Sequence, residues 1–387
     1  MKNCLKKSII TMLVTIMSMV YAFSPAYATD NISESDKNEL YSSTKAFGDS
    51  MAIVAADLNS FTSTIEKSVE IVTIKDLRDF VGNRYAVAEC SPTGYIIYNY
   101  KNSSIVEYSE YADSPYLNCE GDLYYCGPME YYEKTADNCF INTITGTCVD
   151  EKTLEIYETA SKELQEGLIK DSHKQSINRE RNSSPKSITY TYVGGHKNFY
   201  YNLASSSQMG YYVPTGSDGI CGYIAAGLVL LYHDYYFNNN YIVNSTYLAS
   251  GGQAFNGIGF TQRLYYIGTV NLSYDDTLTA GQAANVMKKY LSLDRNITIN
   301  YWSAVNPSLV QIRNQISYHG TPVIYENKFV NPNNTSQTVH HDVVVYGYTN
   351  DDRLVVHFGW PGRSHIVCTG TALLIWNSTA SAIANYS

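Results

Sequence analysis

Apolar residues near the N-terminus recur with the period of a helix. Between Ser33 and Val69 they follow one another at steps of three and four residues, which places them on one helix face. These positions are Leu40, Phe47, Met51, Val54, Leu58 and Phe61. The pattern also predicts a second helix from Leu154 to Lys170.

Between these helices, short runs rich in Tyr, Val and Ile predict β-strands. The runs are Tyr85–Glu89, Gly94–Tyr100 and Ile105–Ser109, and Pro, Gly, Asn or Ser residues separate them. Cys139 and Cys148 flank a short stretch that contains Gly. This spacing predicts a hairpin that a disulfide can close.

Residues 173–186 are almost free of apolar side chains, which predicts a solvated linker. Within it, Arg179-Glu180-Arg181 would be accessible to a processing protease. A plain spacer between two domains explains the composition equally well.

The C-terminal half predicts a helix followed by a twisted antiparallel sheet, which is an α+β plan. An apolar helix runs from Cys221 to Tyr236, and a further helix is predicted from Pro307 to His319. Predicted strands are Ile188–Val193, Pro322–Tyr325, His341–Tyr348, Arg353–Phe358 and Thr371–Trp376.

The first 28 residues have the pattern of a secretory signal peptide. Three Lys precede an apolar stretch from Ile9 to Phe23, and Ala26-Tyr27-Ala28 predicts cleavage after Ala28. A membrane anchor is the alternative, but a span needs about 20 apolar residues, more than this stretch supplies. We therefore expect a secreted protein with no membrane-spanning segment.

Charge divides the chain into two chemically different regions. Residues 30–186 carry 15 basic and 27 acidic side chains, a net charge of −12, whereas residues 187–387 carry nine of each. The chain has a net charge of −9 and no basic stripe, so nucleic acid is not an expected partner. A hydrophobic content of 44% argues against disorder.

Cys221 is a candidate nucleophile because it opens an apolar helix. The positive end of the helix dipole favours a thiolate and would lower the thiol pKa. Ser217 and Asp218 are candidate helix caps. Cleavage after Ala28 leaves seven cysteines, an odd number that leaves one thiol unpaired in an oxidising compartment. The alternative is a buried structural cysteine.

A thiolate needs a general base, and histidine serves best near neutral pH. His233 lies too far along the Cys221 helix. His173 lies in the predicted linker, His196 and His365 in polar loops, and His319 at a helix end. The remaining candidates are His340, His341 and His357. His341 begins a predicted buried strand, and His357 lies in the next strand of the hairpin. An odd number of loop residues would place His341 and His357 on one face of the sheet. The alternative is that both are ordinary sheet histidines.

Three segments resemble secreted bacterial cysteine peptidases of the streptopain type, in the papain-like superfamily. GICGYIAAGLVLLYHDYY resembles the nucleophile helix, HHDVVVYGY the histidine strand, and VVHFGWPG the segment that follows it. YAVAECSPTGYIIYNYKNSSIVEYSEYADSPY and LYYCGPMEYY resemble the pro-segment that covers such enzymes. The order and spacing of these segments are more specific than any one of them.

The resemblance implies a papain-like α+β fold, with a nucleophile helix packed on a twisted antiparallel sheet and a preceding α+β pro-segment. The implied organisation is a signal peptide over residues 1–28, a pro-segment over 29–172, a linker over 173–186 and a peptidase domain over 187–387. The pro-segment would act as an intramolecular inhibitor, and the substrate would be a polypeptide.

By the same resemblance, Cys221 is the nucleophile, His341 the general base and then acid, and Gln208 the oxyanion donor. His357 stands where the family usually has Asn and would orient the imidazole, while Trp360 would shield the pair from solvent. No cofactor or metal is implied, since His340-His341 with a distant Cys lacks zinc-ligand spacing.

Two other functions remain open. A Cys-His-His set also resembles cell-wall amidases of the NlpC/P60 type, which cut peptidoglycan peptides. Alternatively, the chain is a secreted binding protein that keeps the fold but has impaired catalysis, because His357 departs from the family pattern.

Overall fold

The computed structural model describes most of the chain after residue 50. The described residues are 51–135, 137, 139–149, 151–179, 187–197, 219–237, 240–243, 247, 257–331, 334–360, 362–370 and 379–384. The chain divides into two units, Met1–Ile53 and Val54–Ser387, and the second holds nearly all of the described residues. The description below concerns the second unit.

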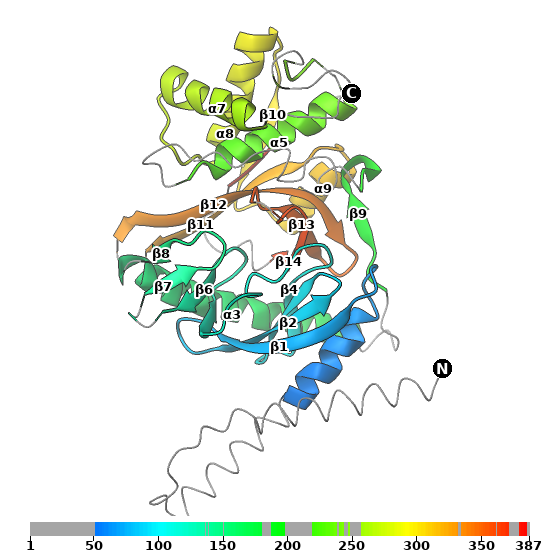
Figure 1. Cartoon of the computed structure of the whole chain (residues 1–387). Helices are drawn as coiled ribbons and strands as arrows, with labels where there is room; N and C mark the ends of the chain where they lie inside the picture. Colours follow the sequence, from blue (N-terminus) through cyan, green and yellow to red (C-terminus); the bar gives the residue numbers. More distant parts are fainter. Residues whose placement is uncertain are drawn as a thin grey trace, which may run out of the picture. The chain divides into compact units, whose positions relative to one another are not determined.

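The strands alternate with helices mainly in the C-terminal half (Figure 1). The strands are β1 (Glu70–Arg78), β2 (Arg84–Ser91), β3 (Tyr95–Asn99), β4 (Ser104–Ser109), β5 (Asp122–Tyr125), β6 (Tyr131–Lys134), β7 (Phe140–Asn142), β8 (Cys148–Val149), β9 (Tyr190–Tyr192), β10 (Tyr301–Val305), β11 (Val323–Asn331), β12 (Asn334–Thr349), β13 (Arg353–His357), β14 (Ile366–Thr369) and β15 (Thr379–Ile383). The α-helices are α3 (Glu151–Arg179), α5 (Cys221–Tyr236), α7 (Gly257–Tyr266), α8 (Ala280–Tyr290) and α9 (Leu309–Ser317), and residues 54–62 are also helical.

Among the described residues, the strands form one sheet that crosses the predicted boundary between the acidic region and the C-terminal half. Its order is β10-β15-β11-β12-β13-β14-β4-β3-β2-β1-β5-β6-β7-β8, with β9 paired to β12. The link is the antiparallel pair of β14 with β4, in which Cys368 lies opposite Glu107. The predicted linker therefore does not separate two independent sheets.

Helices cover both faces of the sheet around β11 and β12. Helices α5 and α8 pack on one face, against β11, β12 and β15, and α3 of the acidic region packs against β11 and β12 (Figure 1). Every residue of α5 from Gly222 to Asp234 is buried, which explains its almost unbroken apolar sequence. Helices from both halves of the chain thus pack against strand β12.

Most predicted elements are confirmed, with shifted ends. Helix α5 begins and ends where the apolar run predicted, and strands β2, β3, β4, β12 and β13 match their predicted segments. Strands β1, β5, β6, β10, β14 and β15 and helices α7 and α8 were not predicted. The predicted helix over residues 33–50 and the predicted strand at Thr371–Trp376 lie outside the described residues.

The predicted end of the second helix is wrong. Helix α3 continues past Lys170 to Arg179, so the first half of the predicted linker is helical. A polar composition alone does not end a helix, because Lys, Gln and Arg are good helix formers. No Gly follows Lys170 before residue 187, and the first Pro is Pro185.

The predicted hairpin disulfide is confirmed, but the expectation of a single free thiol is wrong. Cys139 and Cys148 are bonded to each other. Five cysteines are free among the described residues: Cys90, Cys119, Cys126, Cys221 and Cys368. Cys90, Cys126 and Cys368 are buried, so being unpaired does not by itself distinguish Cys221.

Within the described residues, no helix combines the length and apolar character that a membrane crossing requires.

Candidate functional site

Cys221 is the first residue of α5. Ile220 caps the helix without a side-chain hydrogen bond, and its carbonyl accepts from the N–H groups of Tyr223 and Ile224. The thiol is half-buried, and its Sγ lies 3.8 Å from Oδ2 of Asp342 on β12. Ser217 and Asp218, the candidate caps, lie outside the described residues.

The pKa of Cys221 is shifted opposite to the sequence prediction. Burial raises the pKa of the thiol above its ordinary value, while backbone hydrogen bonds at Asp342 and Gly222 and the Asp342 side chain act in the opposite direction. A helix N-terminus lowers the pKa of a thiol only where solvent or hydrogen-bond donors also stabilise the thiolate. In this form of the chain, the thiol is the favoured state.

Asp342 is a buried acid that the sequence analysis missed. It lies opposite Glu326 on β11, and both side chains are almost fully buried. Within the described part of the chain, Oδ1 of Asp342 has no hydrogen-bond partner. Burial raises the pKa of Asp342 well above its ordinary value, and the neighbouring Cys221 and Glu326 raise it further. Its position directly after the candidate base was the available signal.

His341 precedes Asp342 on β12 and faces the opposite side of the sheet, because successive strand residues alternate. Its Nε2 lies 2.8 Å from the main-chain oxygen of Phe358, and its ring centroid lies 4.6 Å from that of Trp360. Burial lowers the pKa of His341, while the Phe358 carbonyl and the charge of Glu130 oppose this shift. Trp360 is itself buried, as expected for a shield over the imidazole.

The structure therefore brings Cys221 and the strand of His341 together, but not the two reacting atoms. The thiol contacts Asp342, the immediate neighbour of His341. No hydrogen bond among the described residues joins Sγ of Cys221 to the His341 ring. Both groups lie at the same level of β12. Cys221 is on α5, which packs on one face of the strand, and the His341 ring is on the other face.

His357 is buried in β13 and does not share a face with His341. It lies opposite Val344, three residues along β12 from His341. The prediction of a shared face is wrong because the register shifts between Val345 and Gly347, where β12 carries one extra residue. Without that extra residue, the two histidines would fall on the same face.

His357 instead makes a local contact within its own turn. The N–H of Gly359 donates to Nδ1 of His357 at 2.9 Å. Gly359 has a φ of +79°, a backbone conformation that favours glycine. A Cβ at Gly359 would lie 3.2 Å from Cγ2 of Ile224, so this turn packs against the first turn of α5.

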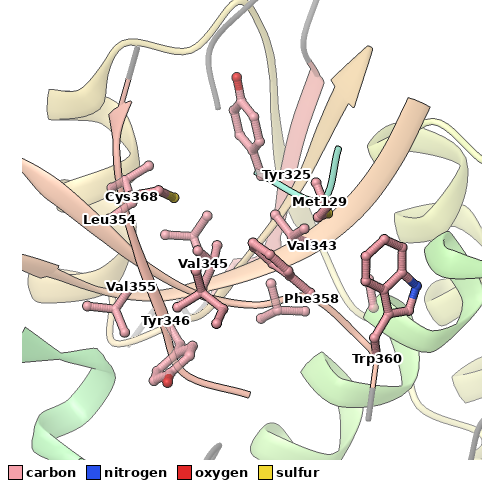
Figure 2. Packing of buried hydrophobic residues seen from close by; sticks show 14 of the residues in the cluster. Met129, Tyr325, Val343, Val345, Tyr346, Leu354, Val355, Phe358, Trp360 and Cys368 are labelled. Atoms are coloured by element: carbon pink, nitrogen blue, oxygen red, sulfur yellow. The ribbon is translucent and has the colours of Figure 1, made fainter. Parts of the chain in front are cut away.

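A turn of the acidic region, residues 127–131, covers the His341 face of β12. Met129 adopts a φ of +77° and is buried with Val343, Phe358 and Trp360 in the hydrophobic cluster of Figure 2. Glu130 is buried and accepts hydrogen bonds from the hydroxyls of Tyr132 and Tyr157. Its charge favours protonated His341, although burial raises the pKa of Glu130 itself. The sequence analysis singled out this segment but not Glu130.

Gln208, the predicted oxyanion donor, lies outside the described residues. Among the residues that are described, no group of three or more His, Cys, Asp or Glu side chains could hold a metal ion.

Comparison with known proteins gives limited information. No family model matches the chain. A search of the curated proteins also finds no match. Among solved structures, a fragment of prointerpain A from Prevotella intermedia is similar at 11% identity and a TM-score of 0.36, over 82% of this chain and 98% of that one. Values this low establish neither a shared fold nor a shared activity.

Proposed function

We propose that this chain is the secreted precursor of a cysteine endopeptidase, with Cys221 as nucleophile and His341 as general base. The observation that carries the proposal is the position of the two groups. The thiol of Cys221, the first residue of α5, contacts Asp342. The residue before Asp342 is His341, whose Nε2 is already bonded to a main-chain carbonyl. A nucleophile, a base and an orienting acceptor are the parts that this chemistry needs.

The proposed reaction is acyl transfer to the thiol. The Cys221 thiolate attacks a peptide carbonyl, forming a C–S bond, while the backbone N–H of Cys221 and the side chain of Gln208 hold the oxyanion. His341 takes the thiol proton and gives it to the leaving amine as the C–N bond breaks. Water then hydrolyses the thioester and restores the thiol. The reaction needs no metal or cofactor.

The acidic region is proposed to keep this site latent. Met129 and Glu130 occupy the His341 face of β12, and the half-buried thiol on the other face has a raised pKa. For catalysis, Glu130 must withdraw, and Sγ of Cys221 and Nδ1 of His341 must come together while Nε2 of His341 stays on the Phe358 carbonyl. Residues 29–172 would thus be an inhibitory pro-segment and residues 187–387 the peptidase domain, after loss of a signal peptide over residues 1–28.

Activation is proposed to begin with a cut near Arg179–Arg181. This site begins at Arg179, the last residue of α3, and a helix end is more open to proteases than a helix interior. One cut does not by itself separate the two parts, because β4 remains paired with β14. Release of the acidic region must also break that strand pair.

The test is to express residues 29–387 as wild type, Cys221→Ala and His341→Ala, and to follow the chain and added casein by mass spectrometry. A matched control is Cys119→Ala, which removes another free, half-buried thiol. We expect wild type and the control to lose the acidic region and cut casein, and the two site variants to do neither. Limited trypsin treatment supplies the first cut if the chain does not make it.

Two outcomes would overturn the proposal. If trypsin-cut wild type leaves casein intact and an epoxide-type thiol inhibitor does not label Cys221, the chain is a binding protein rather than a peptidase. If casein survives but peptidoglycan peptides are cut in a Cys221-dependent way, the chain is a cell-wall amidase.

A further inference from the structure

We propose that the group that orients the His341 imidazole is the peptide unit between Phe358 and Gly359, and that His357 is a positioning residue that holds this peptide. The inference deepens the proposed function, since it concerns the same candidate base. It replaces the expectation that the His357 side chain itself meets the His341 ring.

The protonation of His341 follows from its partner. A main-chain carbonyl only accepts hydrogen bonds, so the contact of 2.8 Å requires a proton on Nε2 of His341. The neutral ring then carries its lone pair on Nδ1. The Phe358 carbonyl therefore selects the tautomer in which Nδ1 is the basic atom.

The protonation of His357 follows in the same way. A backbone N–H only donates, so the Gly359 N–H at 2.9 Å requires an unprotonated Nδ1 on His357. His357 is fully buried, which also favours a neutral ring. The two histidines thus have complementary roles, with His357 as acceptor and His341 as donor.

One planar group joins these two contacts. The carbonyl of Phe358 and the N–H of Gly359 belong to the same peptide unit, whose atoms are held in a plane with the two bonds pointing in opposite directions. Fixing the N–H on His357 therefore fixes the direction of the C=O toward His341. The preceding side of the turn is also tied, since the N–H of Phe358 donates to the carbonyl of Arg363 at 2.9 Å.

The geometry also explains why His357 serves from the opposite face of the sheet. The peptide lies just past the end of β13, so a side chain on one face of the sheet can orient a ring on the other. The left-handed conformation of Gly359 and its closeness to Ile224 on α5 fix this turn against the nucleophile helix. A turn that touches α5 ties the carbonyl that holds His341 to the nucleophile helix.

The first test measures the tautomer of His341 by nitrogen-15 NMR, with histidine labelling, in the full precursor carrying Cys221→Ala. The chain has eight His, and the His341 signals are assigned from a His341→Gln spectrum. We expect the Nε2–H tautomer alone with His357 intact. His357→Leu, which has no acceptor, should give a mixture of tautomers, and His357→Asn should restore the single form because Asn Oδ1 can replace Nδ1.

The second test compares kinetics of the processed protein. Misplacement of a catalytic group by about 1 Å can cost about 100-fold in rate, so His357→Leu should lower kcat by about 10- to 100-fold with little change in KM. His357→Asn should recover most of that loss. In the pH profile of kcat, the limb that reports the ionisation of His341 should shift in His357→Leu only.

Specific results would overturn the inference. One is a pure Nε2–H tautomer of His341 in His357→Leu. Another is a kcat of the processed His357→Leu protein equal to that of wild type. The NMR measurement requires no activity, so a failed peptidase assay with the expected tautomers would reject the proposed function and leave the orienting peptide in place.

Discussion

Two buried carboxylates in this protein have opposite surroundings. Glu107 on β4 accepts hydrogen bonds from the hydroxyls of Tyr95 and Tyr131 at 2.5 Å and of Tyr125 at 3.1 Å. Asp342 on β12 has only the Cys221 thiol, at 3.8 Å, and an Oδ1 with no partner among the described residues. Both are almost fully buried.

The difference separates a well-partnered structural acid from an acid left short of partners beside the candidate nucleophile. Around Glu107, three hydroxyls and the nearby charge of Arg363 satisfy the carboxylate, and its strand pairs the acidic region with β14. Around Asp342, the polar group is left short of partners beside a candidate nucleophile. Unsatisfied buried groups are rare in proteins and concentrate at functional sites, where stability is lost to chemistry.

The largest effect should come from removing the structural acid. Glu107→Leu leaves three buried tyrosine hydroxyls without their acceptor, and each unsatisfied buried donor costs about 1 to 3 kcal/mol, so the loss should be at least about 3 kcal/mol. We expect a drop of that size in the free energy of unfolding of residues 29–387, measured with urea. A cost below about 1 kcal/mol would mean that the tyrosines find other partners and that the cluster is not structural.

A pH-dependent difference should follow from the raised pKa of Glu107. Burial raises this pKa, so the folded state holds the proton more tightly than the unfolded state. That contribution to stability is complete below the ordinary pKa of Glu and is lost as pH rises through the folded pKa. Glu107→Gln, which cannot ionise, should therefore gain stability relative to wild type with rising pH, by at most about 1.4 kcal/mol per pH unit.

Urea unfolding of both proteins between pH 4 and pH 8 measures this difference. Comparing the two proteins removes the contributions of His341, Glu130 and other shifted groups, because both carry them. A difference that is constant with pH would show that Glu107 is ionised equally in the folded and unfolded states.

The smallest effect should come from Asp342, the acid with few partners. Asp342→Asn keeps the size of the side chain and removes a buried carboxyl that has few partners, so we expect a change in stability of less than about 1 kcal/mol, in either direction. The same urea measurement checks it. A loss as large as that of Glu107→Leu would mean that Asp342 is a structural acid, and the comparison between the two regions would collapse.

The sequence pattern was sufficient for elements whose signals are local. Helix α5 is confirmed from Cys221 because its apolar run begins there, and β12 and β13 are confirmed because buried β-branched residues mark them. Helix α8 was missed although Thr279 and Gln282 form a capping box, a signal visible in the sequence.

Other features depend on contacts between distant residues. The extra residue in β12 near Tyr346 changes which face His357 occupies, and nothing in the local pattern fixes that register. The pairing of β4 with β14 and the approach of Glu130 to His341 join segments more than 200 residues apart. The raised pKa of Cys221 depends on burial in the folded chain, which outweighs the backbone hydrogen bonds at the start of α5.

Whether Cys221 is a nucleophile activated by His341 is tested most directly by labelling residues 29–387 with an epoxide-type thiol inhibitor. The labelled cysteines are mapped before and after limited trypsin cleavage. We expect Cys221 in the cleaved protein to react at least about tenfold faster than the other free cysteines, because an activated thiolate is the nucleophile. These are Cys90, Cys119, Cys126 and Cys368. His341→Ala should reduce Cys221 to the rate of the others. Labelling of Cys221 at the rate of Cys119, or labelling that does not depend on His341, would show that Cys221 is not a nucleophile activated by His341.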